Sequence, residues 1–350
     1  MPSWLRPALI AVSLIPLSVW ANPFASLSLI PYGEAKLAGK TIFTLENGDY
    51  ILPSFSPDSH YLAFSRELAE GATELAEIQA LDLKTLRVKT LLDAKSSREF
   101  AVYKSFVADF TWKNATTLKA SISDGDVNGV NLFFDVALGK LIEKKPLGAN
   151  DDGASAAKPS NETLAAFPSI PRPALENALQ NGFKVGNDKY VVQKNYWKQD
   201  NDIWLLDVKT KQITKLIVLP EEWIYSLRGA FAAGNAFIML VAFNKEAYLA
   251  RQQAGRLELL YRLPVSNYQQ TALRVEHANN DRVLFQISTG AAYEKRENYF
   301  FVYDKAGLKK IKDITGIYDL NVDASGHLVC FSLWKENKRK LVIQELKDPR

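Results

Sequence analysis

The sequence predicts an all-β protein, a six-bladed β-propeller made of four-stranded antiparallel blades. Three observations predict it. A strand–turn–strand pattern recurs six times at a spacing of roughly 40–50 residues. Helix signals are scarce, and the 350 residues, 47% of them hydrophobic, suffice for a large buried core. Because one such unit cannot bury its own faces, the six units must stack on one another.

The first unit is the clearest and runs from Ile51 to Thr85. A short apolar strand leads into the turn Ser56-Pro57-Asp58-Ser59, and a second strand follows at Tyr61–Ser65. A third strand ends at Asp82. Turn residues of these types tolerate positive φ or cap their own backbone, so the unit is predicted to be a run of antiparallel hairpins.

Five further units repeat this pattern with little identity. Their turns and second strands read KNATTLKASI, VGNDKYVVQK, AAGNAFIMLV, ANNDRVLFQI and DASGHLVCFS. Asp82, Asp135, Asp207 and Asp304 occupy equivalent places in four third strands, whereas the third strand of the fourth unit, EAYLARQQAG, is degenerate. Fourth strands are predicted at VKTLLD, LIEKKPL, ITKLIVL, LELLYRL and LKKIKDI.

The last unit, Gly316 to Arg350, contains only three strands. An unassigned strand, Lys40 to Leu45, precedes the first unit. We predict that it completes the last blade as the outer strand, which closes the ring by joining the two ends of the chain. This pairing would also remove an exposed sheet edge.

One insertion, Gly148–Gln180, interrupts the pattern between the second and third blades. Its first half is polar and rich in small residues, and Pro173–Gln180 has the proline start and apolar stripe of a short helix. A linker between two domains is the alternative. Because the same repeat resumes after it, we predict a single propeller domain over residues 22–350.

Residues 1–21 have the pattern of a secretory signal peptide. Arg6 precedes an apolar run from Pro7 to Val19, and this run of about a dozen residues is too short to span a bilayer. We expect cleavage before Asn22, a periplasmic or secreted protein, and no membrane span after cleavage; an uncleaved anchor is the alternative.

The lone Cys330 lies in an apolar strand and is predicted to be buried. A net charge of +4 does not indicate a nucleic-acid partner.

The first unit resembles the repeat of TolB-like (WD40-like) propellers. The resemblance rests on Phe55-Ser56-Pro57-Asp58-Ser59 followed by Leu62-Ala63-Phe64-Ser65, and Asp202 to Leu216 resembles the third and fourth strands of that repeat. Ser59 stands where the family has glycine, so this turn must hold its backbone in another way. The resemblance implies the fold, and this fold hosts many functions.

No catalytic residues are predicted. His60, His277 and His327 each fall in or beside a turn of a different blade and are expected to be solvated. One segment, Asp124 to Gly129, fits the opening of a calcium loop, with Asp124, Asp126 and Asn128 as oxygen ligands and Asp135 at the twelfth position. A simple hairpin loop is the alternative, since Asp-Gly and Asn-Gly favour turns.

A recognition surface is predicted where the loops between second and third strands and the links between blades emerge, and we call this end the loop-rich face. Its aromatic and basic residues suit partner binding, and they are Tyr196, Trp197, Trp223, Tyr225, Tyr293, Arg296, Trp334 and Lys335. The alternative is that the rings pack between blades.

The predicted function is therefore an exported, non-catalytic propeller that binds a protein or cell-envelope partner through the loop-rich face. One alternative is a propeller-type hydrolase or lyase acting on a sugar polymer or lactone. Another is a structural spacer in an envelope assembly.

Overall fold

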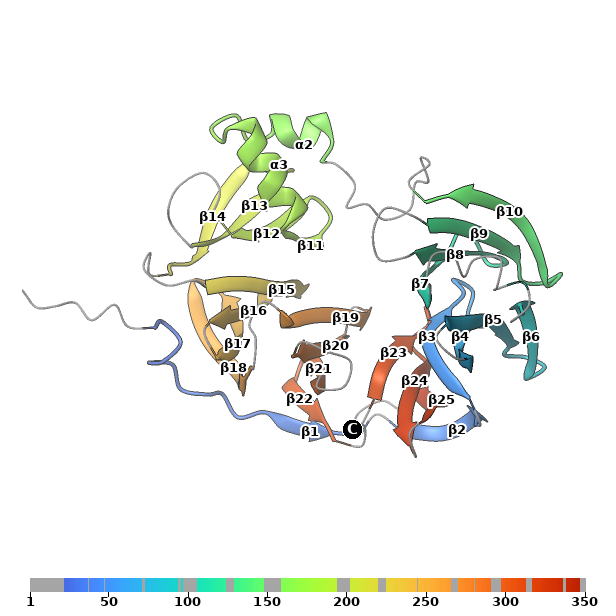
Figure 1. Cartoon of the computed structure of the whole chain (residues 1–350). Helices are drawn as coiled ribbons and strands as arrows, with labels where there is room; N and C mark the ends of the chain where they lie inside the picture. The colour runs from blue at the N-terminus through green and yellow to red at the C-terminus, as the bar shows by residue number, and fades with distance from the viewer. Residues whose placement is uncertain are drawn as a thin grey trace, which may run out of the picture.

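The chain folds into six antiparallel sheets that follow one another around a common centre (Figure 1). The structure is a computed structural model and describes residues 22–36, 38–46, 48–70, 73–93, 96, 106–123, 129–147, 159–193, 202–219, 225–243, 245–265, 270–279, 281–290, 297–312, 317–335 and 338–346. The predicted signal peptide lies outside these residues. The predicted all-β, six-bladed architecture is confirmed by the sheet order.

Each sheet is one blade, numbered in chain order. Blade 1 contains β3 (Asp49–Phe55), β4 (Tyr61–Glu70), β5 (Thr73–Asp82) and β6 (Arg87–Leu92). Blade 2 contains β7 (Phe106–Trp112), β8 (Thr117–Ser123), β9 (Gly129–Asp135) and β10 (Lys140–Pro146). Blade 3 contains β11 (Phe183–Gly186), β12 (Lys189–Gln193), β13 (Ile203–Asp207) and β14 (Gln212–Ile217).

The remaining blades follow the same plan. Blade 4 contains β15 (Tyr225–Ala233), β16 (Ala236–Phe243), β17 (Glu246–Gln253) and β18 (Arg256–Pro264). Blade 5 contains β19 (Ala272–Ala278), β20 (Arg282–Thr289), β21 (Glu297–Asp304) and β22 (Gly307–Ile311), and blade 6 contains β23 (Ile317–Val322), β24 (Leu328–Lys335) and β25 (Lys338–Leu346). The first strand of each blade lies nearest the centre in Figure 1.

The repeated aspartates cap the turns that lead into the fourth strands. The carboxylate of Asp82 accepts a hydrogen bond from the N–H of Thr85 at 3.0 Å. Asp135, Asp207 and Asp304 accept equivalent bonds from backbone N–H groups two or three residues ahead at 2.8–3.0 Å. Each is therefore an Asx-type turn residue, which explains its recurrence along the chain.

The N-terminal strand completes the last blade, as predicted. Strand β2 (Ala38–Leu45) pairs antiparallel with β25, and the sheet order is β2-β25-β24-β23. The predicted strand lies inside β2. A second N-terminal strand, β1 (Gly33–Ala35), was not predicted; it pairs in parallel with β22 and makes blade 5 five-stranded.

The segment before β1 lies along blade 4. Phe24 is 1% exposed and its ring stacks on that of Tyr248 with centroids 4.7 Å apart. Asn22 Nδ2 donates to Tyr248 Oη at 2.8 Å, and the N–H of Ile30 donates to the carbonyl of Leu259 in β18 at 2.9 Å. Residues 22–45 therefore contact blades 4, 5 and 6 in turn.

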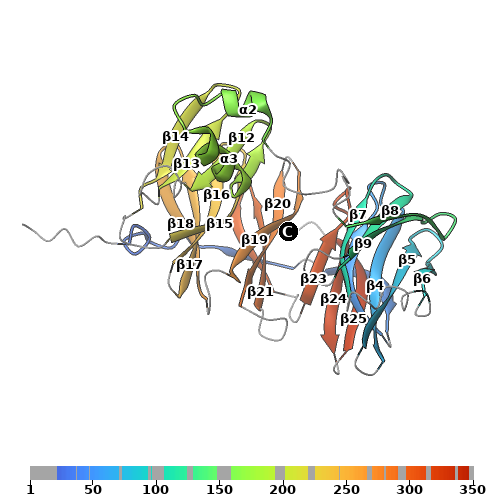
Figure 2. The same cartoon turned by 45° about the horizontal axis from the view of Figure 1, so that its top comes forward.

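Buried clusters join five pairs of neighbouring blades. They lie between blades 1 and 2, 3 and 4, 4 and 5, 5 and 6, and 6 and 1. Among the described residues, no such cluster joins blade 2 to blade 3, and these two blades stand apart in both views (Figures 1 and 2). The core therefore runs from blade 3 through blades 4, 5, 6 and 1 to blade 2.

Two helices cover the other face of blade 3. The described part of the insertion forms α2 (Asn161–Ala165) and α3 (Arg172–Gln180), and the second agrees with the helix predicted at 173–180. Their apolar residues pack on Val192 of β12 and Leu206 of β13. The opposite side of the same sheet, including Val191 and Ile203, belongs to the core shared with blade 4. The helices thus bury a face that would otherwise need a neighbouring sheet.

Cys330 is fully buried in β24, as predicted. It belongs to the cluster between blades 6 and 1, beside Leu341 and Ile343. Over the part of the chain that the structure describes, no helix has the length and apolar character needed to cross a bilayer.

Candidate interaction surface

The loop-rich face lies where second strands end and first strands begin. Most of the predicted binding residues, namely Tyr196, Trp197, Trp223, Tyr293 and Arg296, fall outside the described residues. Trp334 and Lys335 are the last two residues of β24, and the register pairs them with Arg339 and Lys338 of β25. The backbone therefore places these two at the tip of the blade 6 hairpin.

Tyr225 is the one predicted binding residue whose side chain the structure describes. It is 1% exposed, stacks on Phe243 with ring centroids 4.5 Å apart, and lies 6.3 Å from the ring of Phe24. Burial raises the pKa of Tyr225 to about 12, so the phenol stays neutral. This position supports the packing alternative for Tyr225, whose ring lies between blade 4 and the N-terminal segment.

Polar side chains fix the strand ends at the loop-rich face. Gln193, the last residue of β12, donates from Nε2 to the carbonyl of Tyr225 at 2.6 Å and accepts from the N–H of Leu227 at 3.0 Å. Ser332 of β24 donates to the carbonyl of Tyr50 at 2.9 Å. Asn298 of β21 donates to the carbonyl of Ile317 at 2.8 Å. Three blade junctions thus share one device, a side chain bonded to the start of the next inner strand.

Two of these three side chains, Gln193 and Ser332, stand at a position with a sequence signal that the prediction missed. The fifth residue of the second strand is polar in five of the six blades, at Ser65, Ser121, Gln193, Gln286 and Ser332, and Leu240 is the exception. Such a residue stands out in a strand whose other positions are mostly apolar. In blade 2, Ser121 donates to Asn131 Oδ1 of its own blade at 2.7 Å.

We expect Gln193→Ala to lower the free energy of unfolding by about 2 kcal/mol, because it leaves the Tyr225 carbonyl and the Leu227 N–H without this partner. Urea unfolding of the purified protein measures this. Gln193→Glu is a second variant: it keeps the acceptor for Leu227 but sets a carboxylate oxygen against the Tyr225 carbonyl, so it is expected to destabilise the protein as well. An alanine variant with the stability of the parent would show that the junction between blades 3 and 4 does not need the bridge.

The predicted calcium loop lies outside the described residues at Asp124, Asp126 and Asn128. Only Asp135, the proposed closing ligand, is described, and its Oδ1 accepts from the N–H of Leu138 at 2.8 Å. Asp135 is therefore engaged in the turn between β9 and β10. The described residues contain no group of three or more His, Cys, Asp or Glu side chains that could hold a metal ion.

Calcium binding by residues 124–128 stays a prediction. If oxygens of this loop hold the ion, millimolar calcium raises the melting temperature above that measured in chelator. The Asp124→Asn/Asp126→Asn variant then melts at one temperature in both buffers. If the parent protein melts at the same temperature in calcium and in chelator, residues 124–128 do not bind calcium.

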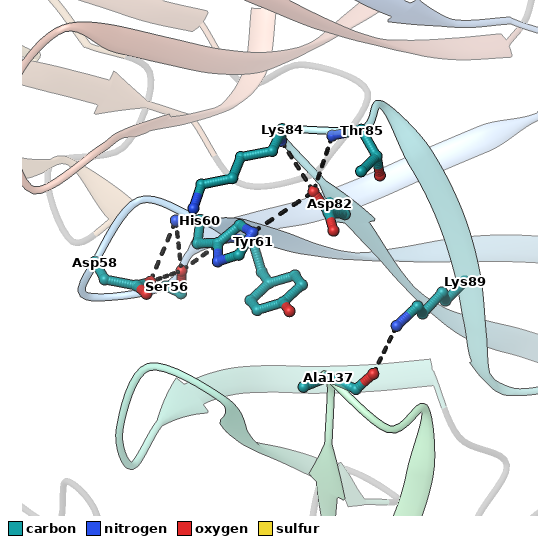
Figure 3. Close-up of polar contacts among 9 residues, drawn as sticks. All are labelled: Ser56, Asp58, His60, Tyr61, Asp82, Lys84, Thr85, Lys89 and Ala137. Carbon is teal, nitrogen blue, oxygen red and sulfur yellow. Dashed lines mark hydrogen bonds and ion pairs between the residues drawn. The ribbon is translucent and has the colours of Figure 1, made fainter.

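The opposite end of the molecule, which we call the turn face, carries the turns between first and second strands. In blade 1 the buried Ser56 hydroxyl accepts from the N–H groups of His60 at 3.1 Å and Tyr61 at 2.9 Å, and it donates to Asp58 at 2.6 Å (Figure 3). Burial raises the pKa of Asp58, but the bonds from Ser56 and from the N–H of His60 outweigh it and hold that pKa below its usual value. His60 Nε2 lies 3.6 Å from Asp82.

Blade 6 builds the same turn with the two residue types exchanged. Asp323 takes the place of Ser56 and accepts from the N–H groups of His327 at 2.7 Å and Leu328 at 2.8 Å, while Ser325 donates to it. Burial raises the pKa of Asp323, but these bonds and one from Ser59 of blade 1 hold it below its usual value.

Ser59 shows how blade 1 does without the glycine of the repeat. Its φ is +57°, the left-handed region that Gly326 occupies in blade 6 at +72°. A serine is strained there relative to glycine. The N–H of Ser59 donates to the carbonyl of Ser56 at 2.9 Å, and the Ser56 hydroxyl fixes the two residues that follow. The turn is therefore held by bonds within its own blade.

His277 of blade 5 and His327 of blade 6 lie closer together than expected if the three histidines were spread evenly around the ring. His277 of blade 5 packs against Gly326, next to His327 of blade 6: a Cβ at Gly326 would lie 2.6 Å from His277 Nε2. His277 Nε2 is buried and has no hydrogen-bond partner among the described residues. Burial lowers the pKa of His277 below its ordinary 6.5, and the charge of Arg282 lowers it further, against the opposing effect of Asp323.

This shift makes stability depend on pH. Because the folded pKa of His277 is below the unfolded one, the unfolded chain binds the proton first as pH falls. The contribution of neutral His277 is complete above 6.5 and decreases as pH falls from 6.5 towards the lower folded pKa. We expect the urea concentration at the midpoint of unfolding to decrease when the pH is lowered from 7 to 5. The decrease should be smaller in the His277→Gln variant than in the parent protein. Equal slopes in the two proteins would contradict this assignment.

Comparisons with known proteins add similarity at the level of the fold. No protein-family model matches the chain, and a search of curated proteins finds no match. Matching solved structures include prolyl endopeptidases (12% identity, TM-score 0.32, covering 86% of this chain and 41% of that one) and the mitotic checkpoint complex (10%, 0.40, 92% and 100%). A putative TolB from Agrobacterium tumefaciens also matches (10%, 0.29, 86% and 91%). At these TM-scores the fold assignment rests on the sheet order of this chain.

Proposed function

We propose that this protein is an exported, non-catalytic β-propeller that binds a protein or another cell-envelope component through its loop-rich face. One observation carries the proposal. At three junctions, Gln193, Ser332 and Asn298 tie the start of the next inner strand to the preceding blade. The strand ends that carry the loops are therefore held in a fixed frame.

A fixed frame suits recognition because it lowers the entropy lost on binding. The loops on this frame contain the aromatic and basic residues Trp197, Tyr293 and Arg296, and the β24 hairpin ends in Trp334 and Lys335. Such residues commonly dominate binding energy at interfaces. The proposal uses these five and leaves out Tyr225, which is buried.

The test compares loop variants with variants of the turn face. Immobilised protein lacking residues 1–21 captures candidate partners from an envelope extract, and each purified candidate is then titrated against the variants. Trp197→Ala and Tyr293→Ala are each expected to weaken binding about tenfold or more. Lys209→Ala and Lys211→Ala, on the turn before β14, are expected to leave it unchanged.

Two results would overturn the proposal. In the first, the turn-face variants weaken binding and the loop variants do not, which would move the interface to the other end. In the second, the protein releases product from a sugar polymer or a lactone, which would favour the alternative of a hydrolase or lyase.

A further inference from the structure

The N-terminal segment covers the outer edges of some blades and leaves others bare. It lies along β18 of blade 4, pairs with β22 of blade 5 and supplies β2, the outer strand of blade 6. The outer strands of blades 1 and 2 are β6 and β10, which end their sheets. Every residue of β10 is exposed or only half-buried. These two edges therefore form a surface of a different kind from the edges of blades 4 to 6.

Apolar side chains gather on this uncovered edge. Ten large hydrophobic residues are exposed among those described, and half of them lie on β6, β10 and the turns leading into them. These five form what we call the rim patch: Leu86, Val88, Leu138, Leu141 and Ile142. Leu138 is 68% exposed and Ile142 56% exposed. Clustering of this kind indicates an interaction site, whereas single exposed residues do not.

The two halves of the patch are adjacent. Lys89 Nζ of β6 donates to the carbonyl of Ala137, in the turn before β10, at 2.6 Å (Figure 3). Leu138 follows Ala137 directly. Leu86 occupies the turn before β6 with φ +54°, a backbone conformation that a leucine rarely adopts. Two neighbouring turns thus each present a leucine to solvent.

Basic residues surround these apolar side chains. Residues 82–92 and 135–146 hold six Lys or Arg and three Asp or Glu, a net charge of +3 out of the +4 of the whole chain. Two of the acids, Asp82 and Asp135, already accept backbone N–H groups in their turns. Lys84, Arg87 and Lys140 are exposed beside the two leucines. The two segments that carry the rim patch are therefore positive on balance.

A lysine-rich outer strand has a simpler use, since lysines prevent one sheet edge from pairing with another. That explanation accounts for Lys140 and Lys144 on β10. It gives no reason for leucines at both turn tips, because exposed apolar groups favour association. Leucines flanked by cations instead match an anionic lipid surface, where aliphatic groups enter the interface and cations contact phosphates. Separate turn tips can insert into lipid singly, without the matched shape that a protein partner needs.

We propose that the rim patch and its flanking cations bind an anionic membrane surface. The outer edges of blades 1 and 2 lie against the headgroups, with Leu86 and Leu138 inserted and Lys84, Arg87 and Lys140 facing lipid phosphates. This surface lies on the outer rim, away from the loop-rich face. The proposal does not depend on the function of that face.

Vesicle co-sedimentation tests it with protein lacking residues 1–21. We expect binding to vesicles of phosphatidylcholine with about 30% phosphatidylglycerol, weak binding to phosphatidylcholine alone, and release at high salt. Neutralising Lys84, Arg87 and Lys140 to Gln together is expected to weaken binding about a hundredfold, roughly fivefold for each cation. Leu138→Ser with Ile142→Ser is expected to weaken it about tenfold or more.

Matched controls come from blade 3. Val218→Ser removes an equally exposed aliphatic residue beside β14, and Lys209→Gln removes a cation from the equivalent turn. Both are expected to bind like the parent, and melting curves confirm that all variants are folded. Equal binding to both kinds of vesicle, or equal losses in rim and control variants, would overturn the proposal. So would an acidic protein that binds the rim patch while vesicles do not, because the partner would then be protein.

Discussion

Deleting Thr41–Leu45 is expected to lower the free energy of unfolding by about 4 kcal/mol or more. The deletion removes most of β2, leaves the edge of β25 unpaired, and takes Phe43 and Leu45 from the apolar cluster between blades 6 and 1. This junction also contains the Ser332 bond to Tyr50, so its loss weakens contacts beyond the deleted strand. Equilibrium unfolding in urea measures the effect.

Point variants separate packing from chain shortening. Phe43→Ala is expected to reproduce a substantial part of the loss, whereas Ile42→Ser, which changes an exposed side chain of the same strand, should change stability by about 0.5 kcal/mol or less. A shortened protein with the urea midpoint of the parent would mean that the last blade is stable with three strands.

Phe24→Ala is expected to lower the free energy of unfolding by about 3–4 kcal/mol. The Phe24 ring is almost fully buried, stacks on Tyr248 and lies beside Tyr225. Its removal would leave a cavity between two aromatic rings, one of which also holds Asn22 by a hydrogen bond. Urea unfolding of protein lacking residues 1–21 is again the measurement.

Leu29→Ala is the matched control, because Leu29 belongs to the same segment and is 46% exposed. We expect it to change stability by about 0.5 kcal/mol or less. If both variants unfolded at the same midpoint, residues 22–30 would not be docked on blade 4 in solution.

Local patterns allowed most of the blades to be predicted from the sequence. Short hairpins record their structure in adjacent residues, so turns such as Ser56–Ser59 and capping residues such as Asp207 mark their strands. The pairing of β2 with β25 could be predicted by counting strands. The last unit has only three strands, and the N-terminal segment contains one strand that belongs to no unit. The degenerate third strand of blade 4 still formed β17, since its apolar positions suffice for pairing on both sides.

Contacts between distant segments were harder to predict. Strand β1 has three residues and no alternation, and its partner β22 lies far along the chain, so nothing local marks it. The docking of Phe24 depends on a site formed by Tyr225 and Tyr248, which no spacing rule connects to residue 24. The described residues show no apolar cluster between blades 2 and 3, and the repeat pattern, which treats all junctions alike, does not predict this difference.

The candidate surface was only partly predictable for a related reason. A tyrosine that binds a partner and a tyrosine packed between blades look the same in sequence, and Tyr225 proved to be packed. The polar fifth position of the second strands was visible in the sequence. Its purpose became clear only when Gln193 and Ser332 were seen to reach the next blade.

The path of residues 22–45 has a consequence for biosynthesis. These residues leave the ribosome early, yet their strand partners and the aromatic rings that Phe24 contacts belong to the last half of the chain, from Tyr225 to Leu346. The segment must therefore wait without its partners until translation is almost complete. A nascent chain interrupted before β25 would keep β2 as a bare strand available for wrong pairing, so successful maturation requires the whole polypeptide.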